Sequence, residues 1–180
     1  MVLSDRSLEH SIATGKIIIK PFSDKIIREN GVDFRLANEI AHHKKHGINV
    51  IIDPTKEDHV KKTYEEIIRT EKMVIEPNEQ VLLSTMEYLG LPNDVMGFVE
   101  LRSTWARHGL SMPPTIIDAG FHGTITLEVI NNAPYKILLR SEQRFAHIIF
   151  AETSSLVRKP YSGSYMEQRG IKLPKKLDLE

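Results

Sequence analysis

The sequence contains no cysteine among its 180 residues. Disulfide bonds, thiolate nucleophiles, iron–sulfur clusters and every zinc site that needs a cysteine ligand are therefore excluded. The sequence also lacks an excess of either charge, because 24 Lys and Arg residues match 24 Asp and Glu residues. No global field attracts nucleic acid or an anionic membrane, so an anionic ligand must be bound by a local cluster of donors.

Long apolar runs are missing as well. No stretch approaches the ~20 apolar residues that span a bilayer. The N-terminus carries Asp5, Arg6 and Glu9 where a signal peptide would be apolar, and we therefore expect a cytoplasmic protein. Hydrophobic residues make up 41% of the chain and charged residues 27%, which fits one globular domain spanning 1–180 and disfavours disorder or two separate lobes.

The pattern of apolar residues predicts a mostly β fold. A capped helix is predicted from Ser4 to about Gly15, and a short helix is predicted in the charged segment 55–72. Many short strands with one or two short helices favour a sandwich or a barrel. The segment 160–180 lacks apolar periodicity and is predicted to be a mobile tail that orders on a ligand. The predicted strands are 17–19, 32–36, 48–52, 72–76, 80–86, 95–101, 124–131, 135–140 and 144–151.

A first chemically informative segment ends at Gly109. Its strand pattern stops at Arg102, and Ser103 and Thr104 then open a short helical stretch. Such a turn presents free backbone N–H groups at a helix N-terminus, where a phosphate is favoured by hydrogen bonding and by the helix dipole. The alternative is that Ser103 caps the helix and that Arg102 and Arg107 are surface cations.

A second informative segment is the strand predicted at 124–131. Side chains of a strand alternate between faces, so Leu127 and Val129 enter the core while Thr126 and Glu128 share the opposite face. A carboxylate at such a position is most often solvated, which is the alternative to a functional role. Its combination with the Arg-Ser-Thr turn favours the functional role.

Taken together, these segments resemble the deoxycytidine triphosphate deaminases, a branch of the trimeric deoxyuridine triphosphatase superfamily. The resemblance covers most of the chain. Each matching motif is weak by itself, but together they occur in the right order. The pieces are Leu3-Ser4-Asp5-Arg6, Gly31-Val32-Asp33-Phe34-Arg35-Leu36, the Arg102-to-Arg107 motif, Ile117-Asp118-Ala119-Gly120-Phe121, Thr126-Leu127-Glu128, Pro160-Tyr161 and Gln168-Arg169-Gly170.

The resemblance implies a fold and an activity. The fold is a distorted β-barrel or jelly roll of the dUTPase-like type, assembled as a homotrimer with sites between subunits. The implied reaction converts dCTP to dUTP with release of ammonia, and it uses Mg²⁺ with the triphosphate but no zinc. The absence of cysteine agrees with this, because zinc deaminases activate water with a His/Cys/Cys or Cys₃ site.

The resemblance also implies three catalytic side chains. Glu128 matches the glutamate that takes a proton from the attacking water and returns it to the ring nitrogen and the departing amine. Ser103 and Arg107 match residues that hold the water and orient that glutamate, from a neighbouring subunit.

A substrate site follows from the same resemblance. Asp118 is expected to accept a hydrogen bond from the 3′-hydroxyl, and Phe121 to exclude a ribose 2′-hydroxyl by packing. Backbone groups around Thr126 are expected to read cytosine. Arg102 and Thr104 match triphosphate ligands, and the tail closes over the phosphates with its own side chains. The implied substrate-binding residues are Arg102, Ser103, Thr104, Trp105, Ala106, Arg107, Asp118, Phe121, Thr126, Leu127, Tyr161 and Gln168.

The sequence departs from the family pattern at three places. Ser164 stands where many relatives have a lysine, and His147 where many have a glutamine. The loop 109–118 is two residues shorter than in bacterial monofunctional enzymes, with Ile116 at the place of an arginine. Three alternatives therefore stay open: a bifunctional enzyme that releases dUMP and pyrophosphate, a dUTPase, and a non-catalytic nucleotide-binding trimer.

The histidines and the tryptophan predict no further chemistry. His42, His43 and His46 lie beside two lysines and indicate an exposed polar patch instead of a metal site. His122 is expected in a turn. Trp105 is expected to pack at an interface, with contact to a base as the alternative.

Overall fold

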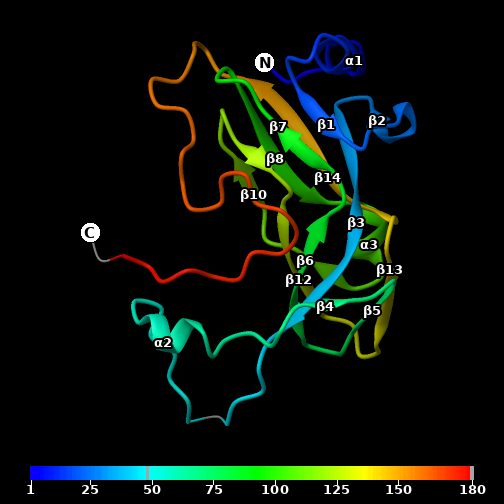
Figure 1. Cartoon of the computed structure of the whole chain (residues 1–180). Helices are drawn as coiled ribbons and strands as arrows, with labels where there is room; N and C mark the ends of the chain where they lie inside the picture. Colours follow the sequence, from blue (N-terminus) through cyan, green and yellow to red (C-terminus); the bar gives the residue numbers. More distant parts are fainter. Residues whose placement is uncertain (48, 179–180) are drawn as a thin grey trace.

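Curved antiparallel sheets form the body of the structure (Figure 1). The computed structural model describes residues 1–47 and 49–178. This part of the chain contains α1 (Asp5–Ala13), the 3-10 helix η1 (Asp24–Ile26), α2 (Glu57–Val60) and α3 (Ser103–Arg107). The strands are β1 (Ile18–Lys20), β2 (Ile27–Arg28), β3 (Gly31–His42), β4 (Ile68–Arg69), β5 (Lys72–Ile75), β6 (Gln80–Thr85), β7 (Tyr88–Gly90), β8 (Val95–Leu101), β9 (Leu110–Ser111), β10 (Thr115–Ile117), β11 (His122–Gly123), β12 (Thr126–Asn131), β13 (Ile137–Arg140) and β14 (Arg144–Glu152).

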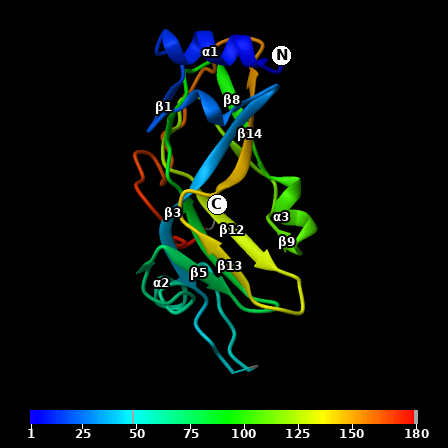
Figure 2. The same ribbon diagram turned by 90° about the vertical axis from the view of Figure 1, so that its right-hand side faces the viewer.

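The largest sheet has the strand order β10-β8-β14-β3-β6-β12-β9, and β2 and β4 also pair with β3. The long strand β3 joins its two halves, because it pairs with β14 near its start and with β6 near its end. A register shift lies between Leu36 and Ile40, and such irregularities bend a strand. Figure 2 shows β3 running along the body, with α1 across one end and α2 near the other.

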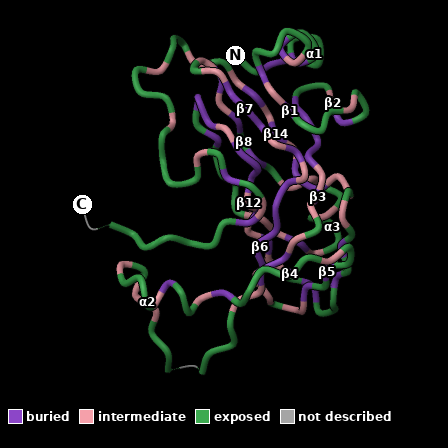
Figure 3. The backbone as a smooth tube through the Cα atoms, in the orientation of Figure 1, coloured by how far each residue is buried: buried purple, intermediate pink, exposed green. Residues whose placement is uncertain are grey.

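The predicted alternation of β12 is confirmed. Leu127 and Val129 are buried, whereas Thr126 and Glu128 are only partly covered. Figure 3 shows the same contrast across the molecule, with buried positions along the strands and exposed positions in the connections. The mostly β fold predicted from the sequence is therefore correct, and the outer face of β12 is free to line a cavity.

Two predictions about the elements are corrected. The strand predicted at 48–52 is absent over 49–52, where Val50 and Ile51 are exposed and belong to the connection between β3 and β4; position 48 lies outside the described residues. An apolar run forms a strand only where a partner strand offers hydrogen bonds, which local sequence does not reveal. The described residues also contain three α-helices instead of one or two, because α2 and α3 are each single short turns.

The C-terminal segment, residues 160–178, packs against the body in this structure. The Tyr161 N–H donates to the Ala119 carbonyl over 2.9 Å, and the Thr124 N–H donates to the Gln168 carbonyl over 3.0 Å. Ile171 is buried. Mobility of this segment and its closure on a ligand stay predictions. Within the described residues, no helix has the length and apolar character needed to cross a membrane.

Candidate active site

A cavity of about 550 Å³ lies on the outer face of β6 and β12, next to the C-terminal segment. Its walls come mainly from three parts of the chain: the two strands, the segment from β10 through the loop that follows it, and residues 161–174. Tyr64 of the connection between β3 and β4 and Val99 of β8 also line it. Six side chains predicted to bind substrate or to catalyse line this cavity together, namely Asp118, Phe121, Thr126, Glu128, Tyr161 and Gln168.

Glu128 is the carboxyl group at the β-sheet wall of the cavity. In the antiparallel pair of β6 and β12, Glu128 lies opposite Leu82, and Thr126 lies opposite Ser84. Burial raises the pKa of Glu128 above its ordinary value, and a hydrogen bond from its own backbone N–H opposes this shift. Among the described residues it forms no ion pair. A carboxyl group in this situation is suited to accept a proton near neutral pH.

The loop after β10 places Asp118 and Phe121 at the opposite wall. The Phe121 N–H donates to the Asp118 carbonyl over 3.1 Å, which closes a tight turn. Gly120 within this turn has a φ of +85°, and a Cβ there would lie 2.7 Å from the Cβ of Pro160. Only glycine satisfies both conditions without strain. The turn thereby brings the C-terminal segment against the loop.

Aromatic and amide groups of the C-terminal segment complete the cavity. The Tyr161 ring lies 5.7 Å from the Phe121 ring, centroid to centroid. Gln168 is buried, and its side-chain N–H donates to the Thr124 carbonyl, while its Oε1 has no hydrogen-bond partner. A buried acceptor without a partner is available for a donor on a ligand.

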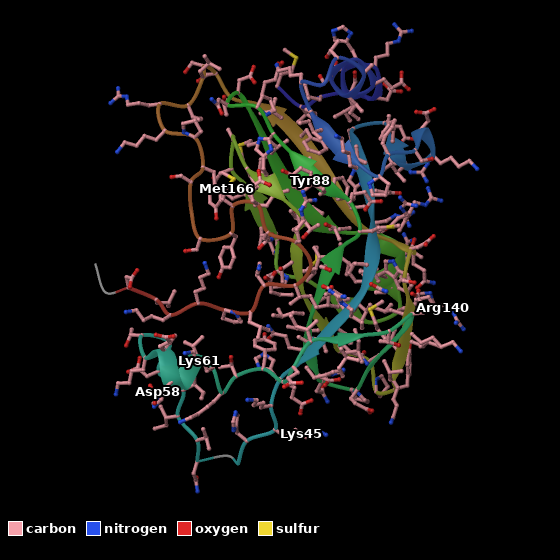
Figure 4. All side chains as sticks on the ribbon, in the orientation of Figure 1. Lys45, Asp58, Lys61, Tyr88, Arg140 and Met166 are labelled. Atoms are coloured by element: carbon pink, nitrogen blue, oxygen red, sulfur yellow. The ribbon has the colours of Figure 1, made fainter. Side chains whose placement is uncertain are left out.

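A second set of contacts holds the same segment on β7. The Tyr88 hydroxyl donates to Glu167 over 2.9 Å, and the Arg169 guanidinium lies 3.9 Å from the centroid of the Tyr88 ring. Figure 4 labels Tyr88 and Met166, which mark this crossing of β7 by the C-terminal segment. The segment is therefore fixed on both sides of Gln168.

The residues of α3 do not line this cavity. Ser103, Thr104, Ala106 and Arg107 are exposed, and in Figure 1 α3 lies on the other side of the body from the C-terminal segment. Within one chain, Glu128 and the Ser103–Arg107 helix thus form two separate surfaces. The sequence-based expectation that these surfaces meet through a neighbouring subunit stays a prediction.

Arg102 at the start of α3 belongs to a cluster around a buried carboxylate. The Arg102 Nε lies 3.1 Å from Asp33 Oδ2, the Arg28 Nε lies 3.0 Å from the same oxygen, and the His147 Nδ1 lies 2.9 Å from Asp33 Oδ1. Burial alone would raise the pKa of Asp33, but the hydrogen bonds from His147 and Arg28 and the charge of Arg102 outweigh it and lower the pKa. Arg144 also reaches Asp33, at 3.8 Å.

Two of the predicted substrate-binding residues, Trp105 and Leu127, pack within the protein itself. The Trp105 Nε1–H donates to the Arg144 carbonyl over 2.9 Å, and its ring lies 5.6 Å from the Phe145 ring. Leu127 is buried and does not line the cavity. Only its backbone is therefore placed to contribute to a site on the open face of β12.

Several residues that line the cavity were not predicted from the sequence, and three of them carry polar groups next to Glu128 or the C-terminal segment: Tyr64, Gln80 and Lys172. Tyr64 lies in the charged connection between β3 and β4, where no periodic pattern marked it. Gln80 begins β6 and is its one residue that is not buried, but its closeness to Glu128 depends on the pairing of β6 with β12. Lys172 belongs to the segment treated as a tail. None of these positions carries a local signal that would have identified it.

The histidines form no metal site in the described part of the chain, where no group of three or more His, Cys, Asp or Glu side chains is placed to hold an ion. His42 Nδ1 lies 2.8 Å from Glu79, and His46 Nε2 lies 2.7 Å from the Lys62 carbonyl. These side chains therefore have contacts with the protein itself.

Comparison with solved structures identifies the class of fold. The chain superimposes with a TM-score of 0.64 and 20% identity on a 2′-deoxycytidine 5′-triphosphate deaminase from Agrobacterium tumefaciens, over 83% of this chain and 46% of that one. The chain thus spans just under half of that protein. At this identity the likeness shows the fold alone.

Sequence comparison identifies the family. The model of the dCTP deaminase-like family matches residues 2–153. A dCTP deaminase of Sulfurisphaera tokodaii is 47% identical over 175 residues, with 97% of this chain and 92% of the relative covered. A viral relative, from Sulfolobus islandicus rod-shaped virus 1, is named a probable deoxyuridine 5′-triphosphate nucleotidohydrolase and is 44% identical over 97% of this chain and 99% of its own. The chain belongs to the dCTP deaminase-like family.

Proposed function

We propose that the protein hydrolyses the 4-amino group of dCTP, so that dCTP and water give dUTP and ammonia. The observation that carries the proposal is Glu128, a carboxyl group withdrawn from water in a cavity of about 550 Å³ and without an ion pair among the described residues. Family membership over residues 2–153 supports the same substrate.

In this reaction Glu128 has two roles, first as a general base and then as a general acid. Its carboxylate first removes a proton from the water that attacks C4 of cytosine. The carboxylic acid then delivers that proton to the ring nitrogen. The restored carboxylate takes a second proton from the new hydroxyl group on C4 and passes it to the amino group, so that the C4 carbonyl forms, ammonia leaves and the carboxylate is restored. Because burial raises its pKa, the group donates and accepts a proton closer to neutral pH than an exposed glutamate does.

Other residues of the cavity supply orientation. Asp118 lines the cavity, and in this proposal it accepts a hydrogen bond from the sugar. Phe121 and Tyr161, whose rings are in contact, line the same cavity. Backbone groups around Thr126 lie on the open face of β12, next to Glu128. We assign the cytosine to this face and the sugar to the Asp118 wall.

The remaining catalytic parts come from a second subunit in this proposal. Ser103 and Arg107 are exposed on α3, away from the Glu128 cavity of their own chain. A homotrimer in which each α3 faces a neighbour's cavity would bring Ser103, Arg107 and Glu128 together, as the resemblance implies. The same contact would bring Arg102 and Thr104 to the triphosphate.

The substrate is the magnesium complex of dCTP. Mg²⁺ is carried by the triphosphate in this proposal, and the positive groups near α3 and the C-terminal segment complement the remaining charge. The C-terminal segment closes over the phosphates with Tyr161 and Gln168. A cytoplasmic location stays a prediction from the sequence.

A bifunctional reaction stays open as a second candidate function. The viral relative with 44% identity carries the name of a dUTP nucleotidohydrolase. A bifunctional enzyme would deaminate dCTP and also cleave the triphosphate, releasing dUMP and pyrophosphate.

Product analysis separates the two functions. The purified protein is incubated with dCTP and MgCl₂, nucleotides are separated by anion-exchange chromatography, and ammonia is measured enzymatically. We expect dUTP and ammonia in equal amounts. dUMP with pyrophosphate would establish the bifunctional reaction, and turnover of dUTP without any ammonia from dCTP would contradict deamination. Glu66→Gln, which changes an exposed glutamate, is the matched control for Glu128→Gln.

A further inference from the structure

Four side chains form a small apolar cluster that is separate from the main core. They are Ala41 of β3, Tyr64 of the connection between β3 and β4, Leu82 of β6 and Ile171 of the C-terminal segment. Each is at most 7% exposed. The cluster therefore joins the sheet, the connection and the C-terminal segment at one point, although these parts are far apart in the sequence.

This cluster lies directly beside Glu128. Leu82 is the cross-strand partner of Glu128 in the β6–β12 pair, and Tyr64, Leu82 and Glu128 line the same cavity. Cross-strand partners have Cβ atoms about 5 Å apart. Apolar groups that cover Leu82 consequently exclude water from the side of Glu128 that faces β6.

Tyr64 is held rigidly at this position. Its ring lies 4.0 Å from the ring of His43, centroid to centroid, and the two residues also form an antiparallel backbone bridge. The Glu65 N–H donates to the His42 carbonyl over 2.8 Å. The end of β3 thus fixes the backbone on which Tyr64 stands.

The pKa of the Tyr64 phenol reflects its burial and its closeness to Glu128. Burial, followed by the negative charge of Glu128, raises the pKa of Tyr64 to about 12, although a hydrogen bond with Gln80 opposes the shift. The phenol is therefore neutral over the whole working range of an enzyme. A neutral, buried aromatic ring next to a carboxyl group lowers the local polarity without adding a countercharge.

Ile171 completes the cluster from the C-terminal segment. Its backbone N–H donates to Glu39 Oε2 over 2.9 Å, and the N–H of the next residue, Lys172, donates to Thr126 Oγ1 over 3.0 Å. Thr126 is two residues before Glu128 on the same face of β12. Docking of the C-terminal segment is thereby linked to the surroundings of Glu128.

We propose that Tyr64 is a positioning residue for Glu128. The Tyr64 ring, together with Leu82 and the docked Ile171, forms an apolar surface that keeps water away from the Glu128 carboxyl group. This inference rests on the proposed function of Glu128 and adds the residues that set its proton affinity. The other titratable groups that line the cavity are Asp118, Tyr161, Tyr165 and Lys172, and they are left unchanged in the test.

The test compares Tyr64→Leu with Tyr64→Phe. Leucine removes the ring and admits water, so the pKa of Glu128 falls; we expect the acidic limb of the kcat–pH profile to move down by about one pH unit and kcat at its optimum to fall about tenfold. Phenylalanine retains the ring, and its acidic limb should coincide with that of the unaltered protein. Tyr135→Leu, which removes an aromatic ring at an exposed position, should shift nothing.

A direct titration keeps this test independent of turnover. Glutamate labelled with ¹³C at the carboxyl carbon is titrated by NMR in the free protein, and Glu128→Gln assigns the signal of Glu128. We expect its pKa to fall in Tyr64→Leu and to fall by a smaller amount in Ile171→Ala, which leaves the body of the protein intact. An unmoved Glu128 signal in both variants overturns the proposal, as does a loss in Tyr64→Phe equal to that in Tyr64→Leu. If Glu128→Gln retains full activity while the titration shifts as expected, the catalytic role fails and the positioning role stands.

Discussion

Glu87 and Glu128 are two carboxyl groups withdrawn from water, and only one of them has a cation beside it. Glu87 is fully buried between β6 and β7, where the Arg35 Nε donates to its Oε1 over 2.6 Å and the Arg35 N–H donates to its Oε2 over 2.8 Å. Glu128 lies in the cavity with no such partner among the described residues. Burial raises the pKa of both groups, but at Glu87 the hydrogen bonds and charge of Arg35 oppose the shift.

The difference separates a paired carboxylate, Glu87, from the carboxyl group that we propose as the base, Glu128. A buried charge that is paired and hydrogen-bonded is part of the packing, and removal of one partner leaves the other uncompensated. A partly buried carboxyl group without a countercharge keeps a high proton affinity and open lone pairs, which is what a general base requires. Burial therefore has different consequences for Glu87 and Glu128, which are about forty residues apart, because only Glu87 has a cation beside it.

The largest expected effect comes from Glu128→Gln, which removes the base and keeps the shape. General acid–base catalysis contributes about 10²- to 10⁴-fold to a rate, so we expect kcat for ammonia release to fall about 10³-fold while dCTP binding changes only a few-fold. Stopped-flow ammonia release and equilibrium binding of dCTP measure the two quantities. Activity equal to that of Glu66→Gln would falsify the assignment of Glu128 as the base.

Arg35→Met is expected to act on stability. It leaves Glu87 buried without its cation, which costs about 3–5 kcal/mol. Urea unfolding followed by circular dichroism measures the loss. The double variant Arg35→Met/Glu87→Leu should recover most of it, because the uncompensated charge is then gone. A loss below about 1 kcal/mol in the single variant would show that the pair contributes little, contrary to its burial.

The smallest effect is the influence of Glu128 on stability. A carboxyl group whose pKa is raised by folding opposes folding once it is ionised; the cost is absent below the pKa of the unfolded chain and grows as pH rises through the folded pKa. Glu128→Gln should therefore be more stable than the unaltered protein at pH 7, by on the order of 1 kcal/mol. Thermal unfolding at pH 7 and near pH 4 checks this, and an equal difference at both values contradicts it.

The sequence predicted the functional face of β12 because that information is local. Period-two alternation placed Leu127 inside and Glu128 outside, and the turn after Arg102 predicted the start of α3; both are confirmed. The strand predicted at 48–52 is wrong over 49–52. Val50 and Ile51 are residue types typical of a strand, but no partner strand lies beside them in the described part of the chain. The sequence could not predict the wall of the cavity around Tyr64, because Tyr64 and Ile171 meet there although they are far apart in the sequence.

The sequence also could not predict which charged side chains form ion pairs. The sequence predicted Arg102 as a phosphate ligand or a surface cation, and it gave no sign of the contact with Asp33 that Arg102 shares with Arg28. Asp33 and Arg102 are brought together because β3 and β8 both pair with β14. Such neighbours depend on strand order, and strand order depends on long-range packing.

By itself, the sequence determined that this protein is mostly β, that no cysteine-based chemistry is available to it, and that Glu128 faces away from the core. These properties follow from composition and from the alternation of side chains along a strand. Only the tertiary structure decided that Glu128 lies in a cavity that Tyr64 and Lys172 also line, while Glu87 is paired with Arg35. The reason is that the proton affinity of a carboxyl group depends on which distant residues exclude its water and which supply its countercharge.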